Sequence, residues 1–146
     1  FFRDPVARLV SGYRDKIRRT PIDDDPALIE RLLQQFNLDR REDIGFSQFA
    51  RFVCSQDDLE RNHHFISQWT LNLGDRITYD FVGRVETYER DMGHVLRTLG
   101  GADSLIATVG HKLHPSSGPP VEVEPTIADL IKTAYAQDYK LLEPDP

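Results

Sequence analysis

The stretch FFRDPVARLVSGY, Phe1–Tyr13, decides how the rest of the chain is interpreted. Its two phenylalanines form a short apolar run of the kind that ends a buried strand. Asp4 is a favourable helix N-cap, and Pro5 suits the first helical position. Apolar residues then recur at helical spacing as far as Ile17. We therefore predict a strand, a tight turn and an amphipathic helix that ends near Arg19.

The middle of the chain predicts further helices and one more strand. Asp25-Pro26 repeats the helix-start signal, and a third, short helix is expected around residues 46–53. Residues 55–63 are polar and are expected to be exposed. The segment ITYDFVGRV, residues 77–85, is rich in β-branched and aromatic side chains and predicts a strand.

The last third of the chain predicts two helices around a long loop. A helix is expected from Glu86 to Leu99, with an apolar face, and the glycine pair that follows should stop it. Residues 111–126 form a loop rich in Pro, Gly and Ser. Thr126 and Asp129 are expected to cap a last helix, and residues 139–146 are expected to be extended.

Strands that are each followed by a helix indicate an α/β layer fold with a parallel sheet. Two strands are too few for a stable sheet, and the chain does not begin with Met. We therefore expect residues 1–146 to be one partial domain whose N-terminal strands are missing.

Composition limits the class of protein. The chain has 146 residues, 39% of them hydrophobic, and a net charge of −6. This content supports a packed core, and the acidic balance argues against a general nucleic-acid binder. No apolar run approaches the about 20 residues of a membrane span, and no secretion signal is visible. The single Cys54 excludes an internal disulfide and a cysteine cluster for zinc.

The charge is unevenly distributed. Residues 1–19 hold six basic and two acidic residues, whereas the rest of the chain is strongly acidic. A cationic segment at a helix start suggests an anion site, because free backbone N–H groups and a guanidinium both attract phosphate. Arg3 is the candidate ligand, joined by the Ser11 hydroxyl. The alternative is that Arg3 pairs with Asp4 or another carboxylate and that the segment is a solvated helix face.

Several motifs resemble those of one enzyme family. The pattern RDPxxRLxSxYRDK at Arg3–Lys16 looks like the 3′-phosphate-binding motif of sulfotransferases that use 3′-phosphoadenosine 5′-phosphosulfate. It is most similar to the carbohydrate sulfotransferases, called sulfotransferase family 2, that include the chondroitin and dermatan enzymes. Four later segments resemble family motifs and follow in the family's order: Phe46–Val53, His64–Gln68, Tyr79–Thr87 with the VLRTLG end of the next helix, and Tyr135–Leu142. The resemblance covers nearly the whole chain.

This resemblance implies a fold, a co-substrate and a reaction. The implied fold is a P-loop NTPase-like parallel sheet flanked by helices. Arg3 and Ser11 would bind the 3′-phosphate of the donor, and a loop upstream of residue 1 would hold its 5′-phosphosulfate. The chain would then be a C-terminal segment that lacks this loop, and it can be inactive by itself. The reaction would transfer a sulfuryl group to a hydroxyl, most simply on a carbohydrate, without a metal.

Two further residues are candidates for the reaction site. An acceptor hydroxyl must lose a proton, and a histidine with a pKa near neutrality can take it. Of the five histidines, only His64 lies in a family-like motif, so we predict that it acts as the base or contacts the acceptor. The alternatives are a histidine that only bonds to loop backbone, or a Glu base. Arg84 follows a predicted strand and a glycine and can reach the donor; alternatively, it pairs with Asp80 or Glu86.

Two other function classes remain open at this stage. A metal-dependent hydrolase would rest on His63 and His64 with nearby acidic residues, although no HxxxH spacing is present. A non-catalytic nucleotide-binding or interaction fragment is the other. The missing cysteines favour a reducing compartment, so we expect a cytoplasmic protein if it is bacterial. A eukaryotic relative with a missing anchor would instead lie at the Golgi membrane or in its lumen. The acceptor and the oligomeric state are not indicated by any motif.

Overall fold

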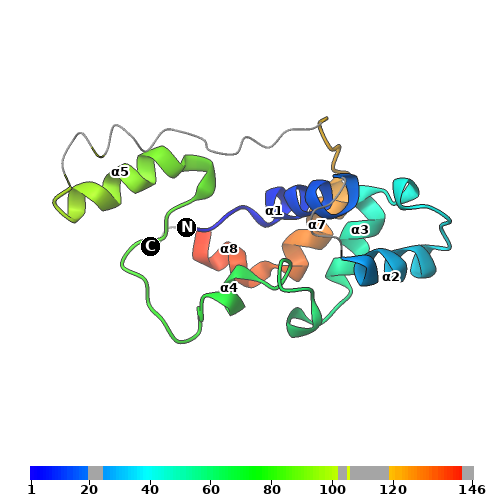
Figure 1. Cartoon of the computed structure of the whole chain (residues 1–146). Coiled ribbons are helices and arrows are strands. Elements are labelled where there is room, and N and C mark those ends of the chain that lie inside the picture. Colours follow the sequence, from blue (N-terminus) through cyan, green and yellow to red (C-terminus); the bar gives the residue numbers. More distant parts are fainter. Residues whose placement is uncertain (20–24, 102–104, 106–118, 143–146) are drawn as a thin grey trace.

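The computed structural model describes residues 1–19, 25–101, 105 and 119–142, and this part of the chain is built of helices (Figure 1). The α-helices are α1 (Pro5–Tyr13), α2 (Pro26–Phe36), α3 (Phe46–Cys54), α4 (Gln68–Leu71), α5 (Tyr88–Thr98), α7 (Pro125–Ala134) and α8 (Ala136–Leu142). A π-helical turn, η1 (Arg14–Arg18), extends α1, and three short 3₁₀ turns are η2 (Arg41–Asp43), η3 (Asp58–Glu60) and η4 (Val85–Thr87). None of the described helices is long and apolar enough to cross a bilayer.

The predicted α/β fold with a P-loop-like parallel sheet is wrong. In the described residues the β-structure is one isolated parallel bridge between Phe2 and Arg84. Phe2 donates its N–H to the Gly83 carbonyl and accepts from the Val85 N–H, both at 2.8 Å. Residues 77–83 have strand-like composition but no strand beside them in the described part, and Ile77 is 45% exposed. β-Branched residues favour a strand only where a neighbouring strand satisfies the backbone.

Two of the predicted helix starts are confirmed. The Asp4 carboxylate accepts the Ala7 N–H at 2.9 Å, and the Asp25 carboxylate accepts the Leu28 N–H at 3.0 Å. In both cases a proline occupies the first helical turn, where its missing N–H costs nothing.

The C-terminal elements differ from the prediction. The cap expected at Thr126 and Asp129 is wrong, because α7 starts after Glu124 with Pro125 in its first turn. Residues 139–142, expected to be extended, belong to α8. Residues 111–118 of the predicted loop and residues 143–146 of the predicted tail lie outside the described residues.

The helix predicted from Glu86 begins two residues later, and its apolar face is not a core face. Tyr88 is 42% exposed and Leu99 is 77% exposed, whereas Asp91 is buried. In Figure 1, α5 lies away from the α1–α3–α7 body. Its predicted stop is confirmed, since Gly100 has a positive φ of 74° that suits glycine after a helix end.

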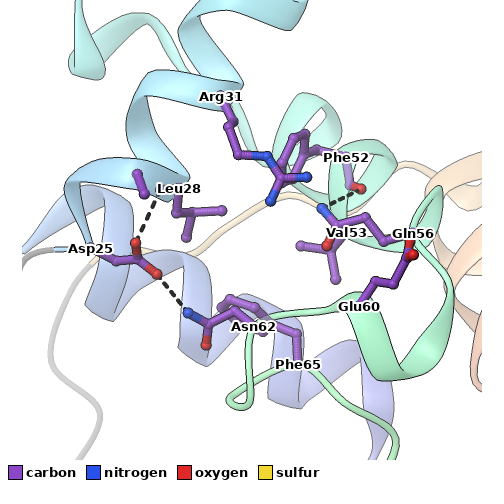
Figure 2. Close-up of a pocket in the computed structure, with 10 residues that line it drawn as sticks. Asp25, Leu28, Arg31, Phe52, Val53, Gln56, Glu60, Asn62 and Phe65 are labelled. Atoms are coloured by element: carbon purple, nitrogen blue, oxygen red, sulfur yellow. Dashed lines mark hydrogen bonds between the residues drawn. The ribbon is translucent and has the colours of Figure 1, made fainter.

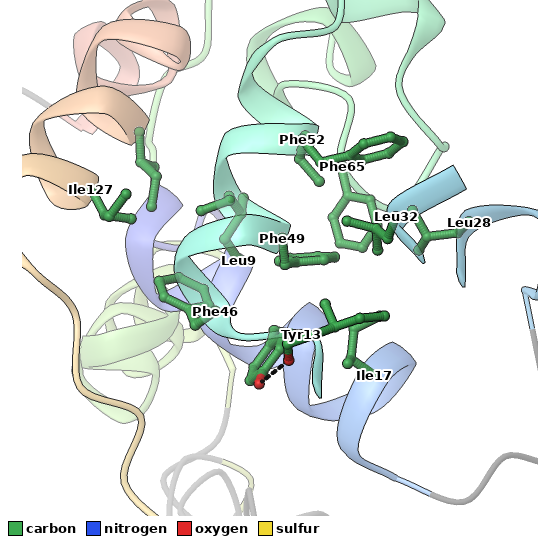
Figure 3. Close-up of a cluster of buried hydrophobic side chains, with 14 of the residues drawn as sticks. Leu9, Tyr13, Ile17, Leu28, Leu32, Phe46, Phe49, Phe52, Phe65 and Ile127 are labelled. Carbon is green, nitrogen blue, oxygen red and sulfur yellow. Dashed lines mark hydrogen bonds between the residues drawn. The ribbon is translucent and has the colours of Figure 1, made fainter. Parts of the chain in front are cut away.

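The core lies where α1, α2, α3 and α7 pack together (Figure 3). Aromatic rings fill its centre. The ring centroid of Phe49 lies 5.6 Å from that of Tyr13, in a tilted arrangement, and 5.2 Å from that of Phe65, edge to face. The buried Tyr13 hydroxyl donates to the Ile44 carbonyl at 2.9 Å, so its polar end is satisfied. The other buried members are Leu9, Ile17, Leu28, Leu32, Phe46, Ala50, Phe52, Val53, Ile127, Ile131 and Tyr135. This core fixes α1, which carries the candidate site.

Candidate functional site

The backbone of Arg3 is held by Gln68. Its N–H donates to Gln68 Oε1 and its carbonyl accepts from Gln68 Nε2, both at 2.8 Å. The amide side chain therefore replaces a strand neighbour at this position. The Arg3 guanidinium has no hydrogen bond or ion pair to any residue in the described ranges. The predicted alternative, an Arg3–Asp4 pair, is not found there.

Asp138 holds Gln68 in place. This carboxylate is fully buried and accepts from the Gln68 N–H at 3.1 Å, from Gln68 Nε2 at 3.2 Å and from the Trp69 N–H at 2.8 Å. A buried carboxylate with several N–H donors is stable without a cation beside it, because the donors replace its water. Asp138 thus fixes the amide that fixes Arg3.

Asp4 closes the helix start beside Arg3. One carboxylate oxygen caps α1, the other accepts from the Tyr139 hydroxyl at 3.2 Å, and the Asp4 N–H donates to Glu86 Oε1 at 3.0 Å. Burial, followed by the Asp4 charge, raises the pKa of Tyr139, so the hydroxyl remains a donor. Two carboxylates already occupy the N-terminal turn. Anion binding by its free N–H groups, as predicted from the sequence, is therefore not favoured.

Arg8 ties the His64 segment to α1. Its guanidinium donates to the His64 carbonyl at 2.9 Å and to the Ile66 carbonyl at 2.7 Å. Phe65 lies between them and packs on Gly12, where a Cβ atom would come within 2.5 Å of the ring. The Tyr135 hydroxyl donates to the Phe65 carbonyl at 2.6 Å. The glycine and the arginine together bring residues 64–66 against α1.

Ser11 lies on the same side of α1 as these contacts. It follows Asp4 by seven residues, which is close to two helical turns, or about 10 Å along the axis. The side chain is partly exposed, and its hydroxyl has no hydrogen bond within the part of the chain that the structure describes. Arg8, four residues after Asp4, shares this face. Arg3 at the start of α1, Ser11 along it and the His64 segment beside it therefore border one face.

His64 is exposed, and its ring lies 3.9 Å from that of His63. The backbone N–H of His64 donates to Asn62 Oδ1 at 3.0 Å. Partial desolvation of the imidazole lowers the pKa of His64, and the charges of Lys16 and His63 lower it further, against the raising effect of Asp15 and Asp25. The imidazole is therefore neutral near pH 7 and able to accept a proton.

Arg84 occupies the other side of the Phe2 bridge. Its N–H donates to Asp91 Oδ2 at 2.8 Å, and its guanidinium donates to the Leu142 carbonyl. Neither of the carboxylate partners considered from sequence, Asp80 or Glu86, pairs with it. A hollow of about 260 Å³ opens here, lined by Asp4, Arg84, Glu86, Thr87, Tyr139 and Leu142.

Asp58, one of the acidic residues that suggested a metal site, has a structural role. Asp58 accepts from Arg61 Nη1 at 2.7 Å, Ser67 Oγ at 2.7 Å and Thr70 Oγ1 at 2.6 Å. Burial raises the pKa of Asp58, but the bonds from Thr70 and Ser67 outweigh this effect and lower it overall. Arg61 was expected to be exposed and is instead 7% exposed, with its guanidinium 4.6 Å from the Tyr135 ring centroid. Among the described residues, no three His, Cys, Asp or Glu side chains are grouped to hold a metal ion.

The cationic N-terminal segment is not simply a solvated face. Arg18 donates to the Tyr13 hydroxyl at 2.6 Å, and Arg14 donates to the Pro119 carbonyl at 2.7 Å. Arg41 binds the carbonyls of Lys16, Ile17 and Arg19, where the helix ends. Arg41 thus satisfies carbonyls at the end of η1. The guanidinium groups of Arg14 and Arg18 also have protein partners, which distinguishes them from Arg3.

Sequence reasoning selected Arg3 and Ser11 as candidates but assigned no role to Gln68, Asp138, Tyr139 or Arg8. Each of these residues lies inside a motif that carried the resemblance. Their hydrogen-bond partners are far away in the sequence: 65 to 135 residues for Gln68, Asp138 and Tyr139, and 56 and 58 residues for Arg8. The available signal was a polar residue inside an apolar motif. Such a residue indicates a buried hydrogen bond but does not identify its partner.

Comparison with known proteins defines the class. The model of the Sulfotransferase family matches residues 1–143, and the chain belongs to this family. It is 30% identical over 106 residues to carbohydrate sulfotransferase 14 of Danio rerio, which covers 68% of this chain and 29% of the relative.

Other curated relatives carry similar names. The chain is 31% identical over 116 residues to carbohydrate sulfotransferase 11 of Danio rerio, covering 72% of this chain and 33% of the relative. It is 32% identical over 120 residues to carbohydrate sulfotransferase 10 of Xenopus laevis, covering 67% of this chain and 31% of the relative. The chain thus spans about a third of the length of these relatives. No solved structure matches it significantly.

Proposed function

We propose that this chain carries the 3′-phosphate-binding and acceptor-activating part of an enzyme that transfers a sulfuryl group from 3′-phosphoadenosine 5′-phosphosulfate to a carbohydrate hydroxyl. Family membership and the names of the relatives support the reaction class. The observation that carries the proposal is the state of Arg3: its backbone is held on both sides by Gln68, while its guanidinium has no protein partner in the described part of the chain.

Arg3 and Ser11 fit a phosphate. A guanidinium offers parallel N–H donors that match two phosphate oxygens, and a hydroxyl adds one further donor. Holding the Arg3 backbone reduces the conformational entropy lost on binding, which improves affinity without an added contact. The backbone of Arg84 pairs with that of Phe2, next to Arg3. One N–H of the Arg84 guanidinium donates to the Leu142 carbonyl, and its other donors remain available to the same nucleotide.

His64 is the proposed proton acceptor. When bound, the donor supplies an activated sulfuryl group, and in-line transfer depends mainly on positioning and charge stabilisation. The lowered pKa keeps the imidazole neutral near pH 7, so it can take the proton of the acceptor hydroxyl. Arg8 holds the backbone of the His64 segment, which leaves the exposed ring free to meet the acceptor.

Transfer of radiolabelled sulfate to carbohydrate acceptors, by the full product of the gene that encodes these residues, tests this function. A His64→Gln variant should bind 3′-phosphoadenosine 5′-phosphate normally but lose about 10²- to 10⁴-fold in kcat. His94→Gln, which removes an exposed histidine on α5, is the matched control and should retain most of the activity. Nucleotide binding without any sulfate transfer by the unaltered protein would favour a non-catalytic binding role. Full activity of His64→Gln would exclude His64 as the base.

A further inference from the structure

A second hollow lies beside the His64 segment. It has a volume of about 220 Å³ and lies between α2, the C-terminal half of α3 and residues 56–65 (Figure 2). The hollow has an apolar floor, since Phe52 and Phe65 are 3% and 2% exposed. Polar groups stand around this floor: Arg31, Gln56 and Glu60 line the same space.

Two opposite charges face this hollow without pairing. The Arg31 guanidinium lies 5.0 Å from the Phe52 ring centroid, a cation–π contact that favours this position. Figure 2 shows Arg31 reaching toward Phe52 from α2, with Gln56 and Glu60 approaching from the other side. Within the described residues, neither Arg31 nor the Glu60 carboxylate forms an ion pair or a side-chain hydrogen bond. A donor and an acceptor, both exposed side chains on the lining of one small hollow, are thus available to a ligand.

The hollow is linked directly to the proposed base. Asn62 lines the hollow, and its Oδ1 accepts a hydrogen bond from the backbone N–H of His64. The same Asn62 side chain donates from Nδ2 to Asp25 Oδ2 at 2.6 Å, so its orientation is fixed. Phe65, the residue after His64, forms part of the floor. A molecule in the hollow would therefore lie beside the backbone of the His64 segment.

We propose that this hollow is an acceptor subsite that binds an uncharged saccharide unit beside the unit that receives sulfate. The inference rests on the proposed function and adds where the acceptor is held. Sugar hydroxyls both donate and accept, so neighbouring hydroxyls can accept from Arg31 and donate to Glu60. Asp25 and Glu60 exceed the single cation Arg31 on the lining, which disfavours an acidic sugar unit. Gln56 keeps its amide oxygen as a further acceptor, since among the described residues its side chain bonds only through Nε2, to the Phe52 carbonyl at 3.3 Å.

Calorimetry on the full gene product with 3′-phosphoadenosine 5′-phosphate present tests this subsite. The probes are a tetrasaccharide of alternating galactose and N-acetylglucosamine and the same chain with glucuronate in place of galactose. Arg31→Gln and Glu60→Gln should each weaken binding of the uncharged probe about tenfold, as expected for one charge-assisted hydrogen bond. The matched controls Arg51→Gln and Glu30→Gln, both exposed and outside the lining, should leave it unchanged.

The outcomes separate this inference from the proposed function. Nucleotide affinity should be the same in all four variants, because none of these residues lies at Arg3 or Ser11. Unchanged affinity for the uncharged probe in both pocket variants would overturn the subsite, and so would preferential binding of the glucuronate probe. A protein that binds neither probe would also overturn it. Failure to bind the nucleotide at all would instead refute the proposed function.

Discussion

Replacing the buried Asp138 with Asn tests how the Arg3 site is supported. The two side chains have almost the same shape, so packing is preserved while the charge and one acceptor are lost. With its oxygen at the Oδ2 position, Asn keeps both bonds from Gln68 but turns its own N–H groups toward the Trp69 N–H. Leaving one buried donor unsatisfied costs about 1–3 kcal/mol, and the loss of charge assistance in the other bonds adds about 1 kcal/mol.

We therefore expect Asp138→Asn to lose about 3 kcal/mol of unfolding free energy, or roughly 10 °C in Tm for a domain of this size. Urea and thermal unfolding followed by circular dichroism measure this loss. In the variant that remains folded at low temperature, affinity for 3′-phosphoadenosine 5′-phosphate should also fall, because the two bonds that orient Gln68 lose their charge assistance and Gln68 then holds Arg3 less firmly. The control Asp129→Asn removes an exposed carboxylate on α7 and should change neither property. Unaltered stability of Asp138→Asn would refute the claim that this carboxylate organises the site.

Three further perturbations have defined outcomes. Gly12→Ala should destabilise the fold by about 1 kcal/mol, because the clash with Phe65 exceeds the gain in helix propensity; equal or higher stability in urea would contradict this packing. Burial raises the pKa of Asp91, but bonds from Arg84, Arg90 and Thr87 outweigh it and hold the pKa at about 2. Because this pKa is depressed, its stabilisation is present above about pH 4 and is lost as the pH falls toward 2, so the stability deficit of Asp91→Asn should vanish over that range in acid unfolding. Lys16→Gln should raise the pKa of His64 by removing a positive charge, as measured by NMR titration, and the acid limb of the rate profile should move with it.

Sequence reasoning succeeded where the local structure depends on residues that are close together in the sequence. The starts of α1 and α2 were predicted because an Asp cap and a following Pro need only the N–H groups of the next turn. The start of α7 was missed because Glu124 does not cap through its own side chain; its carboxylate accepts from Ser47, 77 residues away. The helix end at Gly100 was also predictable from the local backbone preference of glycine.

The fold class was mispredicted for a non-local reason. Residues 77–85 have the composition of a strand, but in the described chain their strand pairing is limited to the single bridge between Arg84 and Phe2. At the next position, Arg3, the Gln68 amide bonds to the backbone in place of a neighbouring strand. The composition of a segment indicates its preference for a strand, but it does not show whether a neighbouring strand is present to pair with it. Arg3 and Ser11 could be selected from sequence because they lie eight residues apart in one motif, whereas the support from Asp138 depends on contacts that only the folded chain shows.

Calorimetric binding of 3′-phosphoadenosine 5′-phosphate, compared with adenosine 5′-phosphate, tests the central claim most directly. The full gene product should bind the first nucleotide much more tightly than the second. Arg3→Ala should remove most of this preference, and Ser11→Ala should reduce it by about tenfold. Arg19→Ala, which removes an exposed guanidinium from the same cationic segment, should have no effect. Equal affinity for both nucleotides, or a preference that survives Arg3→Ala, would contradict the account.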